Sequence, residues 1–187
     1  MGYTFTLVLG LLVAVCVSIS RPLALTEPNK CDKAQISLKG FQTTNTSILF
    51  TEKSFINALG IKKNIADYQG QGIVFNLWAT WCAPCVREMP QLDRLKEKLF
   101  DDKIEVLAIS VDRGGVNVVE KFYSKNNIKN LEILANPSGN ILKETKTIGL
   151  PTTFLINNKG MEIGHIQGTL EWDTPKIVNF LRNCLNQ

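Results

Sequence analysis

Apolar residues along the chain follow two different periods, one typical of buried strands and one typical of helices. Continuous apolar runs, and runs bounded by turn-forming residues, predict five strands: 73–78, 104–111, 131–134, 152–156 and 162–167. The last two flank Asn157-Asn158-Lys159-Gly160, whose turn chemistry predicts a β-hairpin. These strands are separated by segments in which the apolar positions change to helical spacing.

Helical spacing is clearest directly after the strand at 73–78. Apolar residues there recur at three- and four-residue steps and predict a helix that contains Pro90: Val86, Met89, Leu92, Leu95 and Leu99. Further helices are expected at 117–125 and 139–145, and a closing helix begins at Thr174-Pro175, since proline is favoured in a first helical turn. This order predicts an α/β fold with a central mixed β-sheet flanked by helices.

Length and charge narrow the classes of protein that fit. The 187 residues suit one domain and a tail, and 44% hydrophobic residues are enough for a core. The net charge of +4 comes from 21 basic and 17 acidic residues scattered along the chain. A nucleic-acid binder needs a clustered basic surface, so no nucleic-acid partner is expected.

The N-terminal segment has a different composition from the rest. Residues 3–20 carry no charge and approach the roughly 20 apolar residues that span a bilayer, whereas Ser18-Ile19-Ser20 offers small residues for cleavage. Residues 1–20 are therefore expected to be a signal peptide or an N-terminal membrane anchor, which contacts the membrane if uncleaved. Residues 21–47 read as a linker with one short strand near 36–38, and residues 48–187 as the domain.

The candidate chemistry lies in Cys82-Ala83-Pro84-Cys85, between a predicted strand and a predicted helix. Unpaired backbone N–H groups and the helix dipole favour a thiolate at Cys82, which predicts that Cys82 is the nucleophile. Cys85 lies one turn further on and can resolve a mixed disulfide. A structural zinc site needs two more ligands at short spacing, and the remaining Cys and His residues do not supply them, so redox chemistry is favoured and no metal or cofactor is expected.

The residues around this pair resemble a known family. The segment NLWATWCAPCVREMP at 76–90, GLPTTFLI at 149–156 and Glu171-Trp172 are similar to TlpA-type thioredoxin-like proteins, the membrane-tethered group that includes the ResA and CcmG proteins. The resemblance covers about residues 48–187. It implies a thioredoxin-like fold and reduction of disulfides in client proteins outside the cytoplasm, such as those of copper or haem protein assembly.

Individual residues take expected roles from this resemblance. Cys82 and Cys85 would form the redox-active disulfide, and Pro151 would be a cis proline that aligns the backbone of Leu150 with a substrate strand. Trp81 matches the family's aromatic residue beside the nucleophile, although core packing would also explain it. Glu88 matches an acidic position one turn after Cys85, where it would accept a proton or raise the thiol pKa, with a solvated helix residue as the alternative.

Other positions depart from the pattern or stay open. Asn76 stands where thioredoxin has a buried Asp, so the proton acceptor would be Glu88 or water. No His lies between the two cysteines, which favours a reductant over an oxidant. Cys31 and Cys184 form a disulfide or stay free thiols. Two assignments complete the set: His165 reads as an ordinary strand residue, and Asp112-Arg113-Gly114 as a loop that borders the site or is merely solvated.

Three functions remain to be distinguished. The favoured one is a protein-disulfide reductase, catalytic through Cys82, Cys85 and Glu88, with Trp81, Leu150 and Pro151 binding the substrate. The alternatives are a disulfide-donating oxidase or isomerase, and a non-catalytic metal-delivery module. The favoured partners are disulfide-containing clients and a membrane electron donor, and the favoured location is the bacterial periplasm or another extracytoplasmic face, anchored in the inner membrane.

Overall fold

The computed structural model describes residues 1–2, 40–44 and 49–185. An eight-stranded sheet has the order β1-β8-β7-β4-β5-β6-β2-β3. Its strands are β1 (Phe41–Thr43), β2 (Ser54–Asn57), β3 (Lys62–Asn64), β4 (Gly72–Trp78), β5 (Ile104–Ser110), β6 (Leu134–Ala135), β7 (Thr152–Ile156) and β8 (Glu162–Gln167). The helices are α1 (Ala83–Lys98), α2 (Val116–Asn126), α3 (Asn140–Glu144) and α4 (Pro175–Leu185), with 3-10 turns at Ile65–Tyr68 and Phe100–Asp102.

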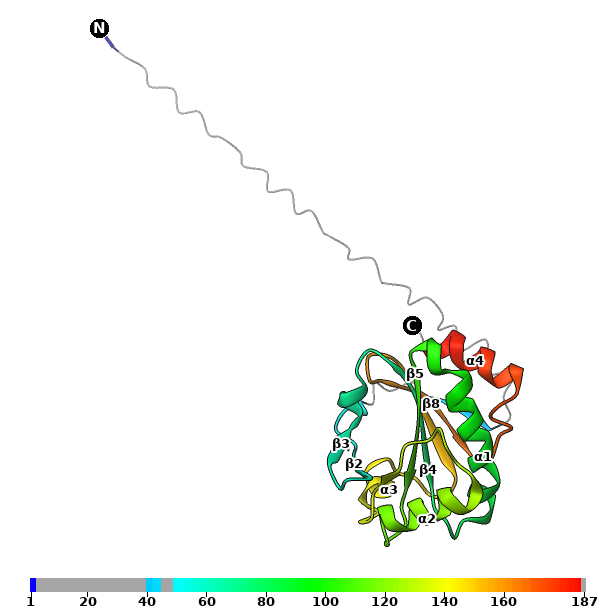
Figure 1. Cartoon of the computed structure of the whole chain (residues 1–187). Coiled ribbons are helices and arrows are strands. Elements are labelled where there is room, and N and C mark those ends of the chain that lie inside the picture. The colour runs from blue at the N-terminus through cyan, green and yellow to red at the C-terminus, as the bar shows by residue number, and fades with distance from the viewer. Residues whose placement is uncertain (3–39, 45–48, 186–187) are drawn as a thin grey trace.

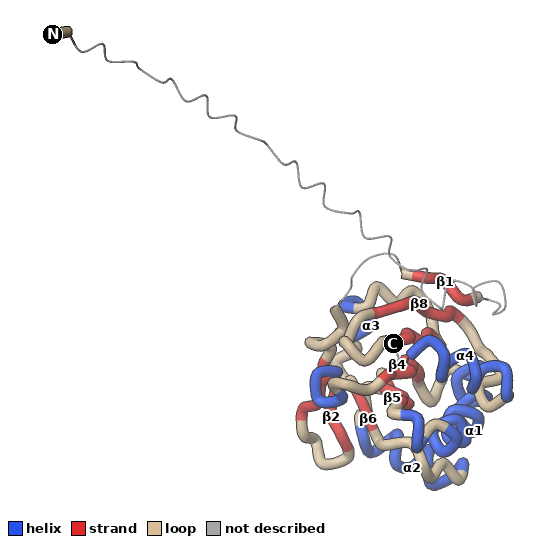
Figure 2. Tube along the Cα trace, turned by 90° about the horizontal axis from the view of Figure 1, so that it is seen from above, coloured by secondary structure: helices blue, strands red, loops and turns tan. Residues whose placement is uncertain are grey.

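The sheet is mixed, as the sequence predicts. The central strand β4 runs parallel to β5 and antiparallel to β7, and all seven of its residues are buried. In Figures 1 and 2, α1 and α4 lie side by side on one face of the sheet, together with α2, while the short α3 lies on the other face. A strand covered on both faces reads as a continuous apolar run, which explains why β4 and β5 are so clear in the sequence.

The second face of the sheet carries an aromatic cluster. Phe75 of β4 and Phe154 of β7 pack with Phe50 and Phe55, and the ring centroids of Phe50 and Phe154 are 5.0 Å apart. The β2–β3 hairpin that supplies Phe55 falls in a region for which the sequence predicted no element. This hairpin joins the sheet through β2 and β6, so it extends the core beyond the predicted strands.

Most predicted elements lie within a residue or two of the observed ones, and two differ. The strand expected at 131–134 is shorter and later, at Leu134–Ala135. The strand expected near 36–38 lies outside the described residues, but β1 pairs with β8, with Gln42 opposite His165. The sheet therefore includes residues from the segment predicted to be a linker, and the folded unit begins before the expected boundary at residue 48.

The predicted targeting segment precedes the sheet in the chain. Residues 3–20 lie outside the described residues, so the choice between signal peptide and anchor stays a prediction. Within the ranges that the structure describes, no helix has both the length and the apolar character needed to cross a membrane.

Candidate functional site

The two cysteines lie where β4 meets α1. After β4 ends at Trp78, a short turn leads to Cys82, which is the N-cap of α1 and has an extended backbone (φ −89°, ψ 96°). Pro84 follows in the first turn, where a missing N–H costs nothing. Cys82 and Cys85 form a disulfide with their Cα atoms 5.3 Å apart, and the N–H of Cys85 points to the Cys82 sulfur at 3.4 Å. The predicted position of Cys82 at the helix N-terminus is confirmed.

The two sulfur-bearing residues differ in exposure. Cys85 is fully buried, whereas Cys82 keeps 6% of its surface accessible and lines a groove. A partner sulfur arriving from solvent can therefore reach Cys82 and not Cys85. Burial also disfavours a thiolate at Cys85, while the helix N-terminus favours one at Cys82.

An apolar groove of about 500 Å³ adjoins Cys82. It is lined by Trp81, Cys82, Ala83, Pro84, Leu142, Thr147, Ile148, Gly149 and Leu150. Trp81 is 70% exposed and Ile148 is 88% exposed, so both present large apolar surfaces to solvent. Core packing therefore does not explain Trp81, and that alternative is wrong.

Pro151 directly follows Leu150, which lines this groove, and has the predicted conformation. The peptide bond between Leu150 and Pro151 is cis. Pro151 is buried and its carbonyl accepts a hydrogen bond from the N–H of Gly168, just after β8, so the loop before β7 is fixed against the neighbouring strand. Leu150 lies at the groove, at the place from which a backbone could pair with an extended polypeptide.

Glu88 is buried inside the protein, not solvated. It is 1% exposed, so the alternative of a surface helix residue is wrong. Its carboxylate accepts hydrogen bonds from Asn76 Nδ2 at 2.9 Å and from Trp172 Nε1 at 3.0 Å. Burial raises the pKa of Glu88 to about 7, because desolvation of the charge outweighs the opposing hydrogen bonds from Trp172, Asn76 and the Leu170 backbone.

Asn76 ties this carboxylate to the sheet. Its side-chain nitrogen also donates to Thr153 Oγ1 at 2.9 Å, so a polar link runs from β7 through β4 to α1. Asn76 is fully buried. By the resemblance described above, it occupies the position of a buried Asp in thioredoxin. Among the described residues of that network, Glu88 is the titratable group, one helical turn from Cys85.

Asp112 fixes the turn that precedes the cysteines. It accepts hydrogen bonds from the Thr80 N–H and the Thr80 hydroxyl, each at 2.8 Å, and from the Ser110 hydroxyl at 2.8 Å. Asp112 is 6% exposed and contacts the turn before the cysteines, whereas Arg113 and Gly114 are exposed, so within this stretch only Asp112 borders the site. His165, which the sequence predicts to be an ordinary strand residue, lies on β8. Its Nδ1 is 3.0 Å from Glu162 Oε1.

Several contributors could not be identified from sequence reasoning. Trp172 was suggested only by the family resemblance. The sequence did not predict the contact between Asn76 and Glu88. Cys184 is buried on α4 and is disulfide-bonded, while Cys31, the partner considered for it, lies outside the described residues.

The fold and the cysteine pair at the start of α1 define a thioredoxin-like protein. Two solved structures show the fold: the pneumococcal exposed lipoprotein thioredoxin Etrx1 from Streptococcus pneumoniae (TM-score 0.59, 24% identity, covering 70% of this chain and 97% of that one) and the thioredoxin domain of a thiol-disulfide oxidoreductase from Bacteroides vulgatus (TM-score 0.62, 16% identity, 77% and 100%). The family model described as "AhpC/TSA family" matches residues 30–163. This chain therefore belongs to the AhpC/TSA family.

Curated relatives show which group of thioredoxin-like proteins this chain resembles. The Thiol-disulfide oxidoreductase ResA of Bacillus thuringiensis subsp. konkukian (strain 97-27) is 34% identical over 109 residues, which are 58% of this chain and 62% of the relative. ResA of Geobacillus thermodenitrificans (strain NG80-2) is 35% identical over 111 residues, 59% of this chain and 63% of the relative. The chain thus spans less than two thirds of these relatives' length. The resemblance to the ResA group is confirmed.

Proposed function

We propose that this chain is an extracytoplasmic thiol–disulfide oxidoreductase that reduces disulfides in client proteins through Cys82 and Cys85. The observation that carries the proposal is the asymmetry of the pair: Cys82 caps α1 at the edge of an apolar groove, and Cys85 is fully buried one turn from a buried carboxylic acid. The names of the ResA relatives support the same chemistry.

The first step joins the client to Cys82. The Cys82 thiolate attacks one sulfur of the client disulfide, a new bond forms between Cys82 and that sulfur, and the second client sulfur leaves as a thiolate that takes a proton from water. Trp81 and Leu150 line the groove in which the client chain would lie during this attack, and the cis Pro151 that follows would hold the Leu150 backbone in place.

The second step releases the client. Cys85 loses its proton and attacks the Cys82 sulfur, so the Cys82–Cys85 disulfide forms and the bond to the client breaks. The client sulfur leaves as a thiolate that takes a proton from water. The client has gained two electrons and this chain has lost them. Because the pKa of Glu88 is about 7, its carboxylate can take the Cys85 proton near neutral pH and return it in the reverse direction.

The proposal also includes the location of the domain and the re-reduction of the Cys82–Cys85 disulfide. Residues 1–20 would direct or anchor the chain, residues 21–47 would space it from the inner membrane, and the domain would work on the outer side. An oxidising compartment keeps thiols oxidised, so a membrane partner must supply two electrons for each client reduced. The similarity to an exposed lipoprotein thioredoxin is consistent with this side of the membrane.

Trapping of the mixed disulfide tests the assignment. With Cys85→Ala, a disulfide-containing protein such as insulin should stay covalently bound to Cys82, because nothing resolves the first step. With Cys82→Ala as the matched control, no adduct should form, since Cys85 is buried. Adducts of equal yield on both variants, or none on either, would contradict the proposed roles.

A further inference from the structure

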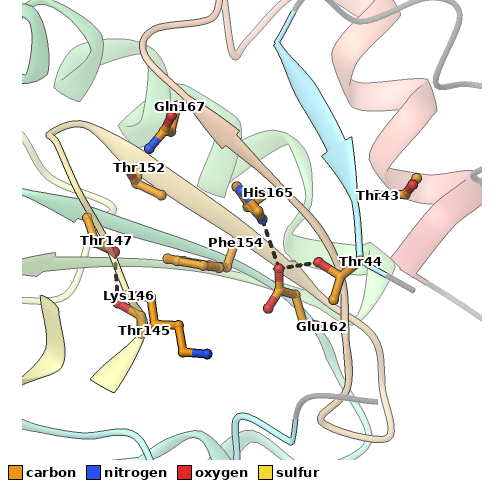
Figure 3. Close-up of a pocket in the computed structure, with 10 residues that line it drawn as sticks. All are labelled: Thr43, Thr44, Thr145, Lys146, Thr147, Thr152, Phe154, Glu162, His165 and Gln167. Atoms are coloured by element: carbon orange, nitrogen blue, oxygen red, sulfur yellow. Dashed lines mark hydrogen bonds and ion pairs between the residues drawn. The ribbon is translucent and has the colours of Figure 1, made fainter. Parts of the chain in front are cut away.

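A second cavity, of about 340 Å³, lies on the face of the sheet that α3 covers only in part. It is lined by Thr43, Thr44, Thr145, Lys146, Thr147, Thr152, Phe154, Glu162, His165 and Gln167. We call it the Glu162 pocket. Figure 3 shows side chains of β7 and β8 on one side of it and the 145–147 segment on the other. None of the redox steps above uses these residues.

Glu162 contributes an unused carboxylate oxygen. Its side chain is only 4% exposed, and Oε1 accepts a hydrogen bond from the Thr44 hydroxyl and lies 3.0 Å from His165 Nδ1. Within the described residues no donor reaches Oε2. Figure 3 shows that oxygen turned away from Thr44 and His165, toward the side of the pocket where Lys146 lies. An acceptor oxygen that faces the pocket, with no donor on it among the described residues, is available to a ligand that donates hydrogen bonds.

Lys146 contributes the opposite charge. Its residue is exposed, and none of the ion pairs in the described part of the chain includes it. Its neighbour Thr145 donates to the carbonyl of Ile141 at 2.7 Å, so in the 2.8 Å contact between Thr145 and Thr147 the hydrogen comes from Thr147. The hydroxyls beside Lys146 are thus engaged in the loop itself, and the ammonium is the available donor there.

The Glu162 carboxylate and the Lys146 ammonium together restrict the class of ligand that the pocket can bind. A simple anion would suit Lys146 but be repelled by the Glu162 carboxylate, and a simple amine would suit Glu162 but be repelled by Lys146. A metal ion lacks a third ligand, because no group of three or more His, Cys, Asp or Glu gathers in the described ranges. A ligand that carries an ammonium and a carboxylate on one carbon satisfies both sides.

We propose that the Glu162 pocket binds a free α-amino acid, with its ammonium on Glu162 and its carboxylate on Lys146. The pocket is next to the redox site, since Thr147 lines both the Glu162 pocket and the groove beside Cys82. Thr152 links them further, because its hydroxyl donates to the Gly149 carbonyl at 2.7 Å. An amino acid held there would order the segment that carries Leu150 and the cis Pro151.

Calorimetric titration of the oxidised full chain tests this binding directly. The probes are L-serine, ethanolamine, which lacks the carboxylate, and L-lactate, which lacks the ammonium. Serine should bind saturably and at least about tenfold more tightly than either, since each analogue loses a charge-assisted hydrogen bond. Absence of saturable serine binding, or equal affinity for all three, overturns the proposal. The oxidised pair takes no part, so this outcome is independent of the redox proposal.

Substitutions of Lys146 and Glu162 test whether the amino acid binds in the Glu162 pocket. Lys146→Met should weaken serine about tenfold without weakening ethanolamine, and Glu162→Gln should weaken both. Lys143→Met on α3 is the matched control, because Lys143 is exposed and does not line the pocket, and it should change nothing. Lys146 is exposed, so its variant stays folded and keeps the test decisive if Glu162→Gln does not fold. Serine affinity unchanged in Lys146→Met would place any binding elsewhere and overturn the assignment.

Discussion

The indole N–H of Trp172 donates a hydrogen bond to the Glu88 carboxylate, 3.0 Å away, across 84 positions of sequence. Both residues are essentially inaccessible to solvent. Trp172 lies between β8 and α4, so this contact fixes the end of the hairpin connection against α1 next to the cysteine pair. It also keeps a titratable group buried in one orientation, which gives the protein a dependence on pH that is open to measurement.

Replacement of Glu88 by Gln should remove a pH dependence of stability. The pKa of Glu88 in the folded chain is about 7, above its ordinary value of 4.5, so the folded state holds this proton more tightly than the unfolded state. The stabilisation is complete below about pH 4.5 and is lost as the pH rises through 7. Between these limits the free energy of unfolding of the oxidised protein should fall by about 3 kcal/mol, and not in Glu88→Gln.

Urea denaturation of the oxidised form at a series of pH values measures this effect, because a disulfide does not titrate. Glu97→Gln is the control, since Glu97 lies on the same helix and is exposed. A slope equal in Glu88→Gln and Glu97→Gln would show that Glu88 titrates like a surface carboxylate.

Alkylation of the reduced protein should distinguish the two cysteines. At mildly acidic pH a short pulse of iodoacetamide should label Cys82 first, because Cys82 caps α1 and faces the groove while Cys85 is fully buried. Mass spectrometry of the peptides reads the ratio, with Cys82→Ser as the control that should lose the fast phase. Equal labelling, or labelling of Cys85 first, would reverse the assigned roles.

Replacement of Asp112 by Ala should loosen the turn before Cys82. Three hydrogen bonds to this carboxylate are lost, including that of the Thr80 N–H, so the free energy of unfolding should fall by about 2–4 kcal/mol. Asp101→Ala is the control, because Asp101 is exposed, and it should stay within about 0.5 kcal/mol of the wild type. Equal stability of the two variants in chemical denaturation would mean that Asp112 does not hold the turn.

Replacement of Trp81 by Ala should affect clients and not folding. Because Trp81 is 70% exposed, stability should change by less than about 0.5 kcal/mol, whereas reduction of a protein disulfide should slow several-fold as apolar contact area is lost. Phe100→Ala removes another exposed aromatic residue, 83% accessible and outside the groove, and should leave the rate unchanged. Equal rates for both variants would exclude Trp81 from client binding.

The parts of the fold that could be predicted are those with a local signal. β4, β5 and α1 follow from an apolar run or a helical repeat, and the cysteine spacing marks the start of α1. The hairpin β2–β3 and the strand β1 were missed because they are three or four residues long and take their partners from distant segments. A short strand acquires its stability from pairing, which a local pattern does not contain.

The residues of the site also fall into those with a local sequence signal and those without one. Cys82, Cys85 and the cis Pro151 could be placed from motifs, but nothing local distinguishes a solvated Glu88 from a buried one. Its burial depends on Trp172 and Asn76, which reach it only in the folded chain. The Glu162 pocket likewise joins β1, β8 and the loop after α3, so its residues are scattered through the sequence.

The equilibrium between dithiol and disulfide at Cys82 and Cys85, measured against a series of glutathione redox buffers, tests the central claim most directly. A reductant that works outside the cytoplasm should have a potential near the roughly −270 mV of thioredoxin. A potential near the roughly −120 mV of a strong periplasmic oxidase would make this chain a disulfide donor, and a pair that does not interconvert at all would contradict a redox function.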